Sequence, residues 1–190
     1  MIYNLLLCLG DSLTAGARDP HLRNYPLELG QLLSTDTGEE WFCATEAANG
    51  RTSSELARDC YAIMSRYPDV YGVLVLIGTN DSRHRIPPDV FEDNLGQILR
   101  VCRILKKRAY VLTIPPVNFQ RHFLWYDREA CTLIAAYNQR IAALKHAEVI
   151  DVAAKIGDDH LVDGVHLTHE GNRLIARVVR DHLLAPAPTS

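Results

Sequence analysis

The sequence lacks a Cys-x-x-Cys pair, a large surplus of either charge and any hydrophobic run long enough to cross a membrane. Its cysteines are odd in number and stand singly in apolar runs, so we expect reduced core thiols and no disulfide framework. They are Cys8, Cys43, Cys60, Cys102 and Cys131. The formal net charge of -3 argues against nucleic-acid binding as the main function.

The first apolar run, residues 2–9, is short, and no basic segment precedes it. This pattern does not resemble a signal peptide or a membrane anchor, so we expect a cytoplasmic protein. The chain has 190 residues, of which 47% are hydrophobic, with no internal repeat. We expect one domain over residues 1–185 and a frayed tail over residues 186–190.

Compact apolar runs alternate with stretches of helical periodicity along the whole chain. The expected strands are residues 2–9, 41–45, 70–77, 109–114 and 147–152. The expected helices are residues 25–34, 53–67, 89–107, 127–145 and 168–184, with Thr52 or Ser53 and Asp89 as caps. This alternation predicts an α/β fold, a three-layer α/β/α sandwich around a five-stranded parallel sheet.

The block Gly10-Asp11-Ser12-Leu13 directly follows the first predicted strand. A buried strand that stops at Gly-Asp-Ser delivers one hydroxyl to the carboxyl end of the sheet, where open α/β folds bind ligands. We interpret Ser12 as a nucleophile. The alternative is an ordinary strand-to-helix turn in which Asp11 or Ser12 caps the next helix.

A second block, Asp163-Gly164-Val165-His166, lies in the loop before the last predicted helix. A serine hydroxyl needs an imidazole to take its proton, and a carboxylate fixes the imidazole tautomer. Asp163 and His166 could fill these two roles from one loop. The alternative is a loop in which Asp163 caps a turn and His166 is solvated.

Two further blocks follow the second and third predicted strands. Gly50 suits a backbone amide that donates to an oxyanion, but it suits a plain turn equally well. In Gly78-Thr79-Asn80-Asp81, the amide of Asn80 could donate to the same oxyanion, or Asn80 could form an Asx turn. The carboxyl ends of parallel strands share one edge, so these loops should meet near Ser12.

The four blocks, in this order over residues 10–166, resemble the SGNH hydrolase superfamily, also called GDSL esterases and lipases. The resemblance implies the flavodoxin-like strand order 2-1-3-4-5. It also implies that Ser12 is the nucleophile, His166 the base and Asp163 its orienting carboxylate. The Ser12 amide, the Gly50 amide and the Asn80 side chain would then form the oxyanion hole.

Other residues on the same side of the sheet are candidate substrate contacts. They are Asp11, Arg83, His84, Trp125 and Tyr126. The basic loop with Arg83 and His84 could instead be solvated without contacting a substrate. Phe119, Phe123 and Trp125 could instead pack their long loop against the core. Polar Asn118, Gln120 and Arg121 could hold a sugar beside the aromatic rings.

The leading hypothesis is a serine hydrolase that cleaves short-acyl carboxylic esters, such as acetyl groups on a carbohydrate, through an acyl-serine intermediate. An acyl thioesterase or lysophospholipase of the same superfamily is the alternative. More remote are a flavodoxin-like nucleotide-binding module, which Asp11 opposes by repelling phosphate, and an inactive adaptor. We expect no cofactor and no metal, since His166 and His169 are the only close histidine pair. The expected partner is a small acyl ester, and the oligomeric state stays open.

Overall fold

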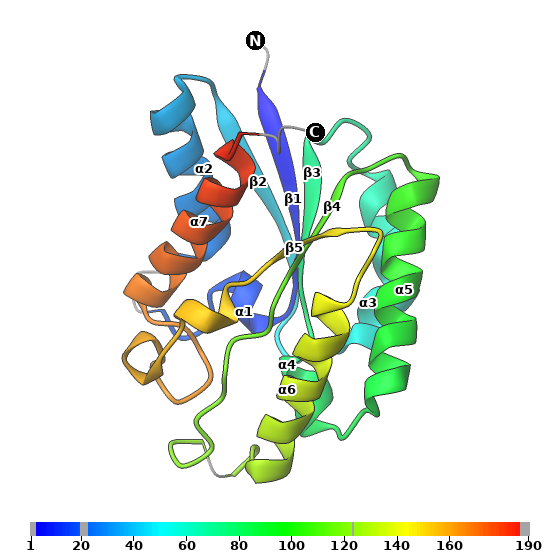
Figure 1. Ribbon diagram of the computed structural model, residues 1–190. Helices are drawn as coiled ribbons and strands as arrows, with labels where there is room; N and C mark the ends of the chain where they lie inside the picture. The colour runs from blue at the N-terminus through cyan, green and yellow to red at the C-terminus, as the bar shows by residue number, and fades with distance from the viewer. Residues whose placement is uncertain (1–2, 20–22, 123, 187–190) are drawn as a thin grey trace.

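The computed structural model describes residues 3–19, 23–122 and 124–186 (Figure 1). Five parallel strands form one sheet in the order β2-β1-β3-β4-β5, as the sequence and the resemblance predict. The strands are β1 Asn4–Gly10, β2 Trp41–Ala47, β3 Gly72–Leu76, β4 Ala109–Leu112 and β5 Glu148–Ile150. The central strand β3 is buried at every position, which is why its sequence is continuously apolar.

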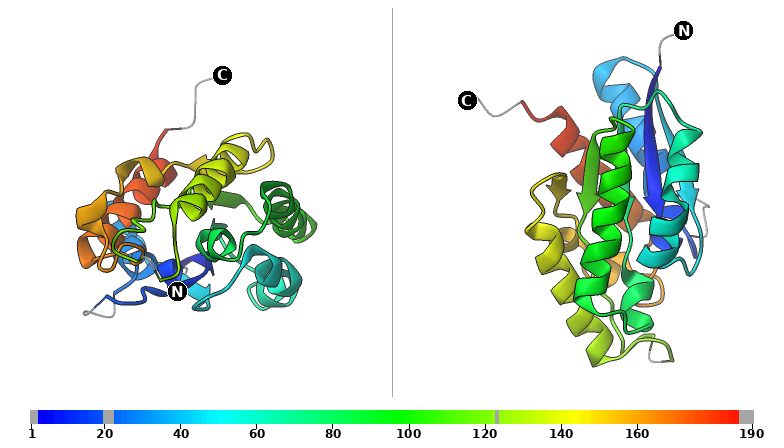
Figure 2. Two further views of the ribbon diagram at one scale, coloured as in Figure 1. Left: turned by 90° about the horizontal axis from the view of Figure 1, so that it is seen from below. Right: turned by 90° about the vertical axis from the view of Figure 1, so that its right-hand side faces the viewer.

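Helices cover both faces of the sheet and make the three predicted layers (Figures 1 and 2). One face carries α2 and α7, which pack against each other, and the opposite face carries α3, α5 and α6. The α-helices are α1 Ser12–Ala15, α2 Tyr25–Thr37, α3 Ser53–Ser65, α4 Thr79–Arg83, α5 Pro88–Ile104, α6 Arg128–Ala142 and α7 His169–Leu184. Two short 3₁₀ turns, η1 Ala153–Lys155 and η2 Asp158–His160, precede α7.

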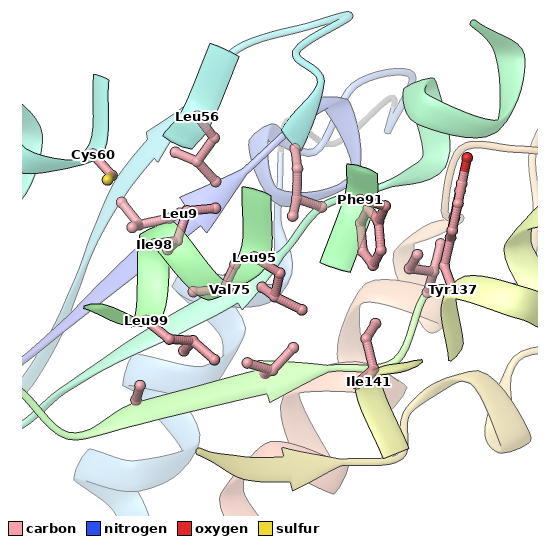
Figure 3. Packing of buried hydrophobic residues seen from close by; sticks show 14 of the residues in the cluster. Leu9, Leu56, Cys60, Val75, Phe91, Leu95, Ile98, Leu99, Tyr137 and Ile141 are labelled. Atoms are coloured by element: carbon pink, nitrogen blue, oxygen red, sulfur yellow. The ribbon is translucent and has the colours of Figure 1, made fainter. Parts of the chain in front are cut away.

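Each face of the sheet has its own buried hydrophobic cluster. On the α3/α5/α6 face, Figure 3 shows Leu9 and Val75 of the sheet beneath side chains of the covering helices. Phe91 of α5 and Tyr137 of α6 stack with their ring centroids 4.4 Å apart. This stacking fixes α5 and α6 against each other beside the carboxyl edge of the sheet.

Local sequence signals explain most helix starts. Thr52 and Glu55 form the expected capping box at the start of α3. The predicted cap at Asp89 is wrong, because Pro87 occupies the cap position and Pro88 begins α5. Proline is favoured in the first helical turn, since its fixed φ is helical and its missing N–H is not needed there.

Several strands end earlier than their apolar runs. Residues 113 and 114 were expected in the fourth strand, but β4 ends at Leu112. The side chain of Asn138 in α6 pairs with both backbone groups of Ile114. It accepts a hydrogen bond from the Ile114 amide at 2.7 Å and donates one to the Ile114 carbonyl at 2.9 Å. An apolar residue can therefore leave the ladder while its backbone groups stay paired.

The register of the three central strands sets where their loops begin. Gly10, the last residue of β1, pairs with Ala47 at the end of β2 and with Leu76 at the end of β3. The loops after these strands therefore leave the sheet at one level. This shared level brings the sequence blocks that contain Ser12, Gly50 and Asn80 to one edge.

The five cysteines are free, and Cys8, Cys60 and Cys102 are buried. Within the described part of the chain, no helix is both long and apolar enough to cross a membrane. The cytoplasmic location and the domain limits at residue 185 stay predictions, and residues 187–190 of the expected tail lie outside the described residues.

Candidate active site

Ser12 begins the one-turn helix α1 directly after β1. The carboxylate of Asp11 accepts a hydrogen bond from the Leu13 amide at 2.9 Å, so Asp11 caps this turn. The turn needs glycine before it: a Cβ at Gly10 would lie 2.1 Å from Oγ1 of Thr14 and 2.5 Å from the carbonyl of Leu76. Asp11 therefore caps the turn, and the same turn places Ser12 at the carboxyl edge of the sheet, so the two interpretations of this block are not alternatives.

A continuous chain of hydrogen bonds joins Asp163, His166 and Ser12. Oδ2 of Asp163 lies 2.8 Å from Nδ1 of His166, and Nε2 of His166 lies 3.1 Å from Oγ of Ser12. A carboxylate beside Nδ1 favours the tautomer with a proton on Nδ1, which leaves Nε2 free to accept the serine proton. This arrangement can activate a hydroxyl for attack on an electrophilic carbon.

The other carboxylate oxygen of Asp163 shapes the loop. It accepts from the amides of Val165 at 3.0 Å and His166 at 2.8 Å. Burial alone would raise the pKa of Asp163, but these hydrogen bonds and the His166 ring hold the pKa below its ordinary value. Asp163 thus stays ionised and can stabilise an imidazolium at His166.

Arg121 supports this loop from the segment after β4. Its guanidinium donates to the carbonyls of Asp158 at 3.0 Å, Leu161 at 3.1 Å and Val162 at 2.7 Å. The backbone amide of Asn118 donates to the carbonyl of Gly164 at 2.8 Å, and its side-chain amide donates to Oδ2 of Asp158 at 2.6 Å. The side chains of Asn118 and Arg121 therefore bind residues 158–162, and neither they nor the exposed Gln120 line the cleft, so the interpretation of these three residues as sugar contacts is wrong.

Asn80 is the second residue of the short helix α4, which follows β3, and it is 5% exposed. Its Nδ2 donates to the carbonyl of Arg51 at 3.1 Å, and its contact with Oδ2 of Asp11 is long, at 3.4 Å. The first bond ties Asn80 to the loop that carries Gly50. Gly50 has a φ of +80°, a conformation that L side chains rarely adopt, which explains the glycine there.

Asp11 lies behind Ser12 rather than in the cleft, and it is fully buried. Burial raises the pKa of its carboxyl group to about 7, and the nearby charge of Asp81 adds to the rise. The prediction that Asp11 contacts the substrate is therefore wrong. Its contacts with the Leu13 amide and with Asn80 make it a residue that positions the edge of the sheet.

A cleft of about 370 Å³ opens over Ser12, a volume near the lower end of the range of ligand sites. It is lined by Ser12, Ala17, Arg18, Asn49, Gly50, Asn80, Arg83, His122, Trp125, Tyr126 and His166. Of the predicted substrate contacts, Arg83, Trp125 and Tyr126 line the cleft. His84 is exposed and does not, so that prediction is wrong.

The aromatic loop divides its side chains between the core and the cleft. Phe119 packs against the core and Tyr126 is buried, whereas Trp125 stays 53% exposed. Phe123 lies outside the described residues. The guanidinium of Arg83 sits 4.0 Å over the Trp125 ring. With Arg18 and Arg83 and no carboxylate among the described lining residues, the cleft is electropositive.

His122 was not singled out from the sequence, although it lines the cleft. Its Nε2 lies 3.8 Å from Oδ2 of Asp163, and its ring centroid lies 5.6 Å from those of Trp125 and Tyr126. No motif or spacing marks His122, because only the fold of the aromatic loop brings it here. Arg18 and Asn49 also line the cleft and were not singled out from the sequence, because no motif marks either side chain.

A larger hollow, of about 980 Å³, lies over α2 and β2 and includes none of the cleft residues. It is lined by apolar and small polar side chains, and among its described lining residues the Cys43 thiol is the only titratable group. The smaller cleft, in contrast, is lined by Ser12 and His166.

A five-stranded parallel sheet in this order, flanked by helices on both faces, is the fold of the SGNH hydrolases. Residues 8–174 match the model of the GDSL-like Lipase/Acylhydrolase family, and the chain belongs to that family. The match includes all four sequence blocks.

A curated arylesterase of Vibrio mimicus is 29% identical over 126 residues, which are 64% of this chain and 62% of that protein. The chain thus spans about three fifths of the length of this relative. The solved structure of TesA superposes with a TM-score of 0.78 at 18% identity, over 95% of this chain and 98% of the other. The esterase EstA from Pseudoalteromonas sp., inhibited by monoethylphosphonate, gives 0.74 at 19% identity, over 95% and 96%. These two structural likenesses concern the fold.

Proposed function

We propose that the protein is a serine esterase that cleaves short-acyl carboxylic esters through an acyl-serine intermediate. The observation that carries this proposal is the hydrogen-bonded series from Asp163 through His166 to Ser12 at the floor of the cleft. Membership of a lipase and acylhydrolase family and the likeness to an arylesterase support the same class of reaction.

In the proposed mechanism, Oγ of Ser12 attacks the ester carbonyl carbon while Nε2 of His166 takes the serine proton. The tetrahedral intermediate collapses, the C–O bond to the alcohol breaks, and His166 returns its proton to the departing alcohol. A water molecule then attacks the acyl-serine with His166 again as the base, which releases the acid and restores Ser12. Asp163 stays ionised and stabilises the imidazolium.

The oxyanion of each tetrahedral intermediate needs donors that are already in place. We assign this role to the amides of Ser12 and Gly50 and to Nδ2 of Asn80. Gly50 and Asn80 both line the cleft with Ser12, and the bond from Asn80 to the Arg51 carbonyl holds the two loops together. The long contact between Asn80 and Asp11 is weak enough to yield to an oxyanion.

The small cleft and its polar lining favour a short acyl group and a compact alcohol such as a sugar. Trp125 offers a ring face for an apolar sugar face or for the acyl chain. The guanidinium of Arg83 lies 4.0 Å over the same ring system and also lines the cleft. We therefore propose acetylated carbohydrates as the substrate class and removal of their acetyl groups as the reaction.

An acyl thioesterase or lysophospholipase is the second candidate. Leu124 and Trp125 are 76% and 53% exposed, and Trp125 lines the cleft, so a long acyl chain could lie across these side chains. A nucleotide-binding role is disfavoured, because the carboxylate of Asp11 already caps the turn at Ser12 where a phosphate would bind.

The test is covalent labelling with an alkyl fluorophosphonate, followed by intact mass and peptide mapping. We expect one adduct, on Ser12, and loss of both labelling and p-nitrophenyl acetate hydrolysis in Ser12→Ala. Ser65→Ala is the matched control, because Ser65 is exposed at the end of α3. An adduct on another residue, or full activity in Ser12→Ala, would overturn the proposal.

A further inference from the structure

His122 brings a second imidazole beside the Asp163–His166 pair. The three side chains come from two segments, and each is partly buried: 19% of the His122 side chain, 27% of Asp163 and 16% of His166 are exposed. Their donor atoms all lie within 4.8 Å of one another. Nothing in the proposed ester cleavage uses this cluster as a unit.

The His122 ring is held in this place by its neighbours. It packs between the rings of Trp125 and Tyr126, and its backbone carbonyl accepts from the amides of the same two residues, at 3.3 and 3.2 Å. Nε2 of the ring lies 3.8 Å from Oδ2 of Asp163, beyond hydrogen-bond distance. An imidazole nitrogen pointing at a carboxylate across this distance leaves room for a cation between them.

We propose that His122, Asp163 and His166 form an inhibitory site for a divalent cation of the zinc type. Two imidazoles and one carboxylate are a common ligand set for Zn²⁺, with a water molecule in the fourth position. Ligand atoms bound to one Zn²⁺ ion lie about 2.0–2.2 Å from it, so tetrahedral donors are roughly 3.3–3.6 Å apart. The three donors need shifts of about 1 Å or less each, within reach of side-chain rotation.

Binding of the cation would switch off the base. Nδ1 of His166 is the ring nitrogen that faces Asp163, at 2.8 Å, and coordination there replaces its N–H with a bond to the metal. The neutral ring then carries its proton on Nε2, the nitrogen 3.1 Å from Oγ of Ser12. A protonated Nε2 cannot take the serine proton, so the enzyme is inactive while the cation is bound.

The same cleft limits the affinity. Arg18 and Arg83 line it and repel a cation, while Asp163 is the one carboxylate in the ligand set. We therefore expect reversible, micromolar binding of Zn²⁺ rather than a permanent metal centre. Magnesium and calcium, which prefer all-oxygen ligands, should not compete.

Binding is tested in Ser12→Ala, which keeps all three ligands but cannot hydrolyse an ester. Calorimetric titration with Zn²⁺ should show one site, and His122→Gln in the same background should weaken it by more than about tenfold, since lost second-sphere partners alone cost about that much. His146→Gln, an exposed histidine before β5, should bind as the parent does. No binding to Ser12→Ala, or equal binding after His122→Gln, overturns the site.

Inhibition is tested in the active enzyme, and this part rests on the proposed function. With p-nitrophenyl acetate, Zn²⁺ should abolish hydrolysis, and EDTA should restore it. For each variant the rate is compared with its own rate in EDTA, and His122→Gln should need more than about tenfold more Zn²⁺ for half inhibition. Binding without any esterase activity would reject the proposed function but keep the site. Activity that Zn²⁺ does not inhibit would reject the inhibitory site.

Discussion

The carboxylate of Asp81 accepts hydrogen bonds from both the backbone amide and the hydroxyl of Ser53, and both residues are fully buried. The contact joins the turn after β3 to the first residue of α3. It therefore fixes the spacing between Asn80, after β3, and Gly50, in the loop between β2 and α3. Asn94 of α5 donates to the hydroxyls of Ser53 and Ser54, both at 2.9 Å, and so stabilises the contact between Asp81 and Ser53.

Replacing Asp81 with Ala should therefore damage both stability and catalysis. The buried amide and hydroxyl of Ser53 would lose their acceptor, which costs about 1–3 kcal/mol in the free energy of unfolding. Urea unfolding measures the first effect and kcat for p-nitrophenyl acetate the second. Asp81→Asn, which keeps one acceptor oxygen, should recover part of both. Full activity in a destabilised Asp81→Ala protein would show that the contact does not align the two loops.

Arg121→Met should lower kcat with little change in KM. Arg121 lies outside the cleft, but its three hydrogen bonds hold the backbone just before Asp163. Small misplacement of a catalytic base costs up to about 10²-fold in rate. Arg128→Met is the matched control, since Arg128 is exposed in the first turn of α6. A loss confined to KM would instead make Arg121 a substrate contact.

Asn80→Ala should lower kcat by ~10²-fold, the usual effect of removing one oxyanion donor. Covalent labelling of Ser12 should become slower by a similar factor, because the phosphonate oxygen uses the same donors. Asn80 also bonds to the Arg51 carbonyl, so circular dichroism and the unfolding midpoint are needed to show an intact fold. An unchanged kcat would leave Asn80 with a turn role only.

Asp11→Asn should change how stability depends on pH. Burial raises the pKa of Asp11 from its ordinary value of 3.8 to about 7. Between these values the folded protein holds a proton that the unfolded chain has released, so stability falls as pH rises from about 4 to about 7. This loss is on the order of 4 kcal/mol. Asparagine keeps an acceptor for the Leu13 amide but cannot ionise.

Urea unfolding of both proteins at about pH 4.5, 6 and 7.5 checks this prediction. The other carboxylates are common to both proteins, so the difference between the two curves isolates Asp11 and its coupling to Asp81. The free energy of unfolding of Asp11→Asn should fall less over this range than that of the natural chain. Parallel curves would mean that Asp11 is ionised at no cost to the fold.

The strands and the core of the site could be predicted because their signals are local. A parallel strand buried on both faces is a continuous apolar run, and a loop that follows it must leave at the carboxyl edge. Ser12 and Asn80 each follow such a run, whereas Gly50 follows the edge strand β2, most of which is only partly buried. The spacing of Asp163 and His166 is local as well, since one loop holds both residues.

The remaining residues of the site depend on contacts between distant segments. Arg121 and His122 belong to a connection without periodicity, and only its packing against residues 158–164 gives either of them a role. His84 was misplaced for the same reason, because a charge cluster does not reveal which of its side chains turns toward the cleft. Asp11 was wrongly predicted to contact the substrate, since sequence alone does not show that a carboxylate that caps this turn is buried.

The length of the acyl chain is the last prediction, and the cleft sets it. Its volume is about 370 Å³, and Arg18, Arg83 and His122 occupy part of its wall, so a long chain must extend over the exposed side chain of Trp125. We expect kcat/KM to be largest for p-nitrophenyl acetate or butyrate and lower for octanoate and palmitate, because a chain too long for the cleft hinders placement of the ester carbonyl over Ser12. Methylenes left in water gain none of the about 0.8 kcal/mol per buried methylene that could offset this loss. Trp125→Ala should lower the octanoate rate further while the acetate rate changes little, and Tyr61→Ala, which removes an exposed ring from α3, should change neither. A maximum at octanoate or beyond would mean that Leu124 and Trp125 build an acyl groove, and would favour the thioesterase or lysophospholipase reaction over removal of acetyl groups.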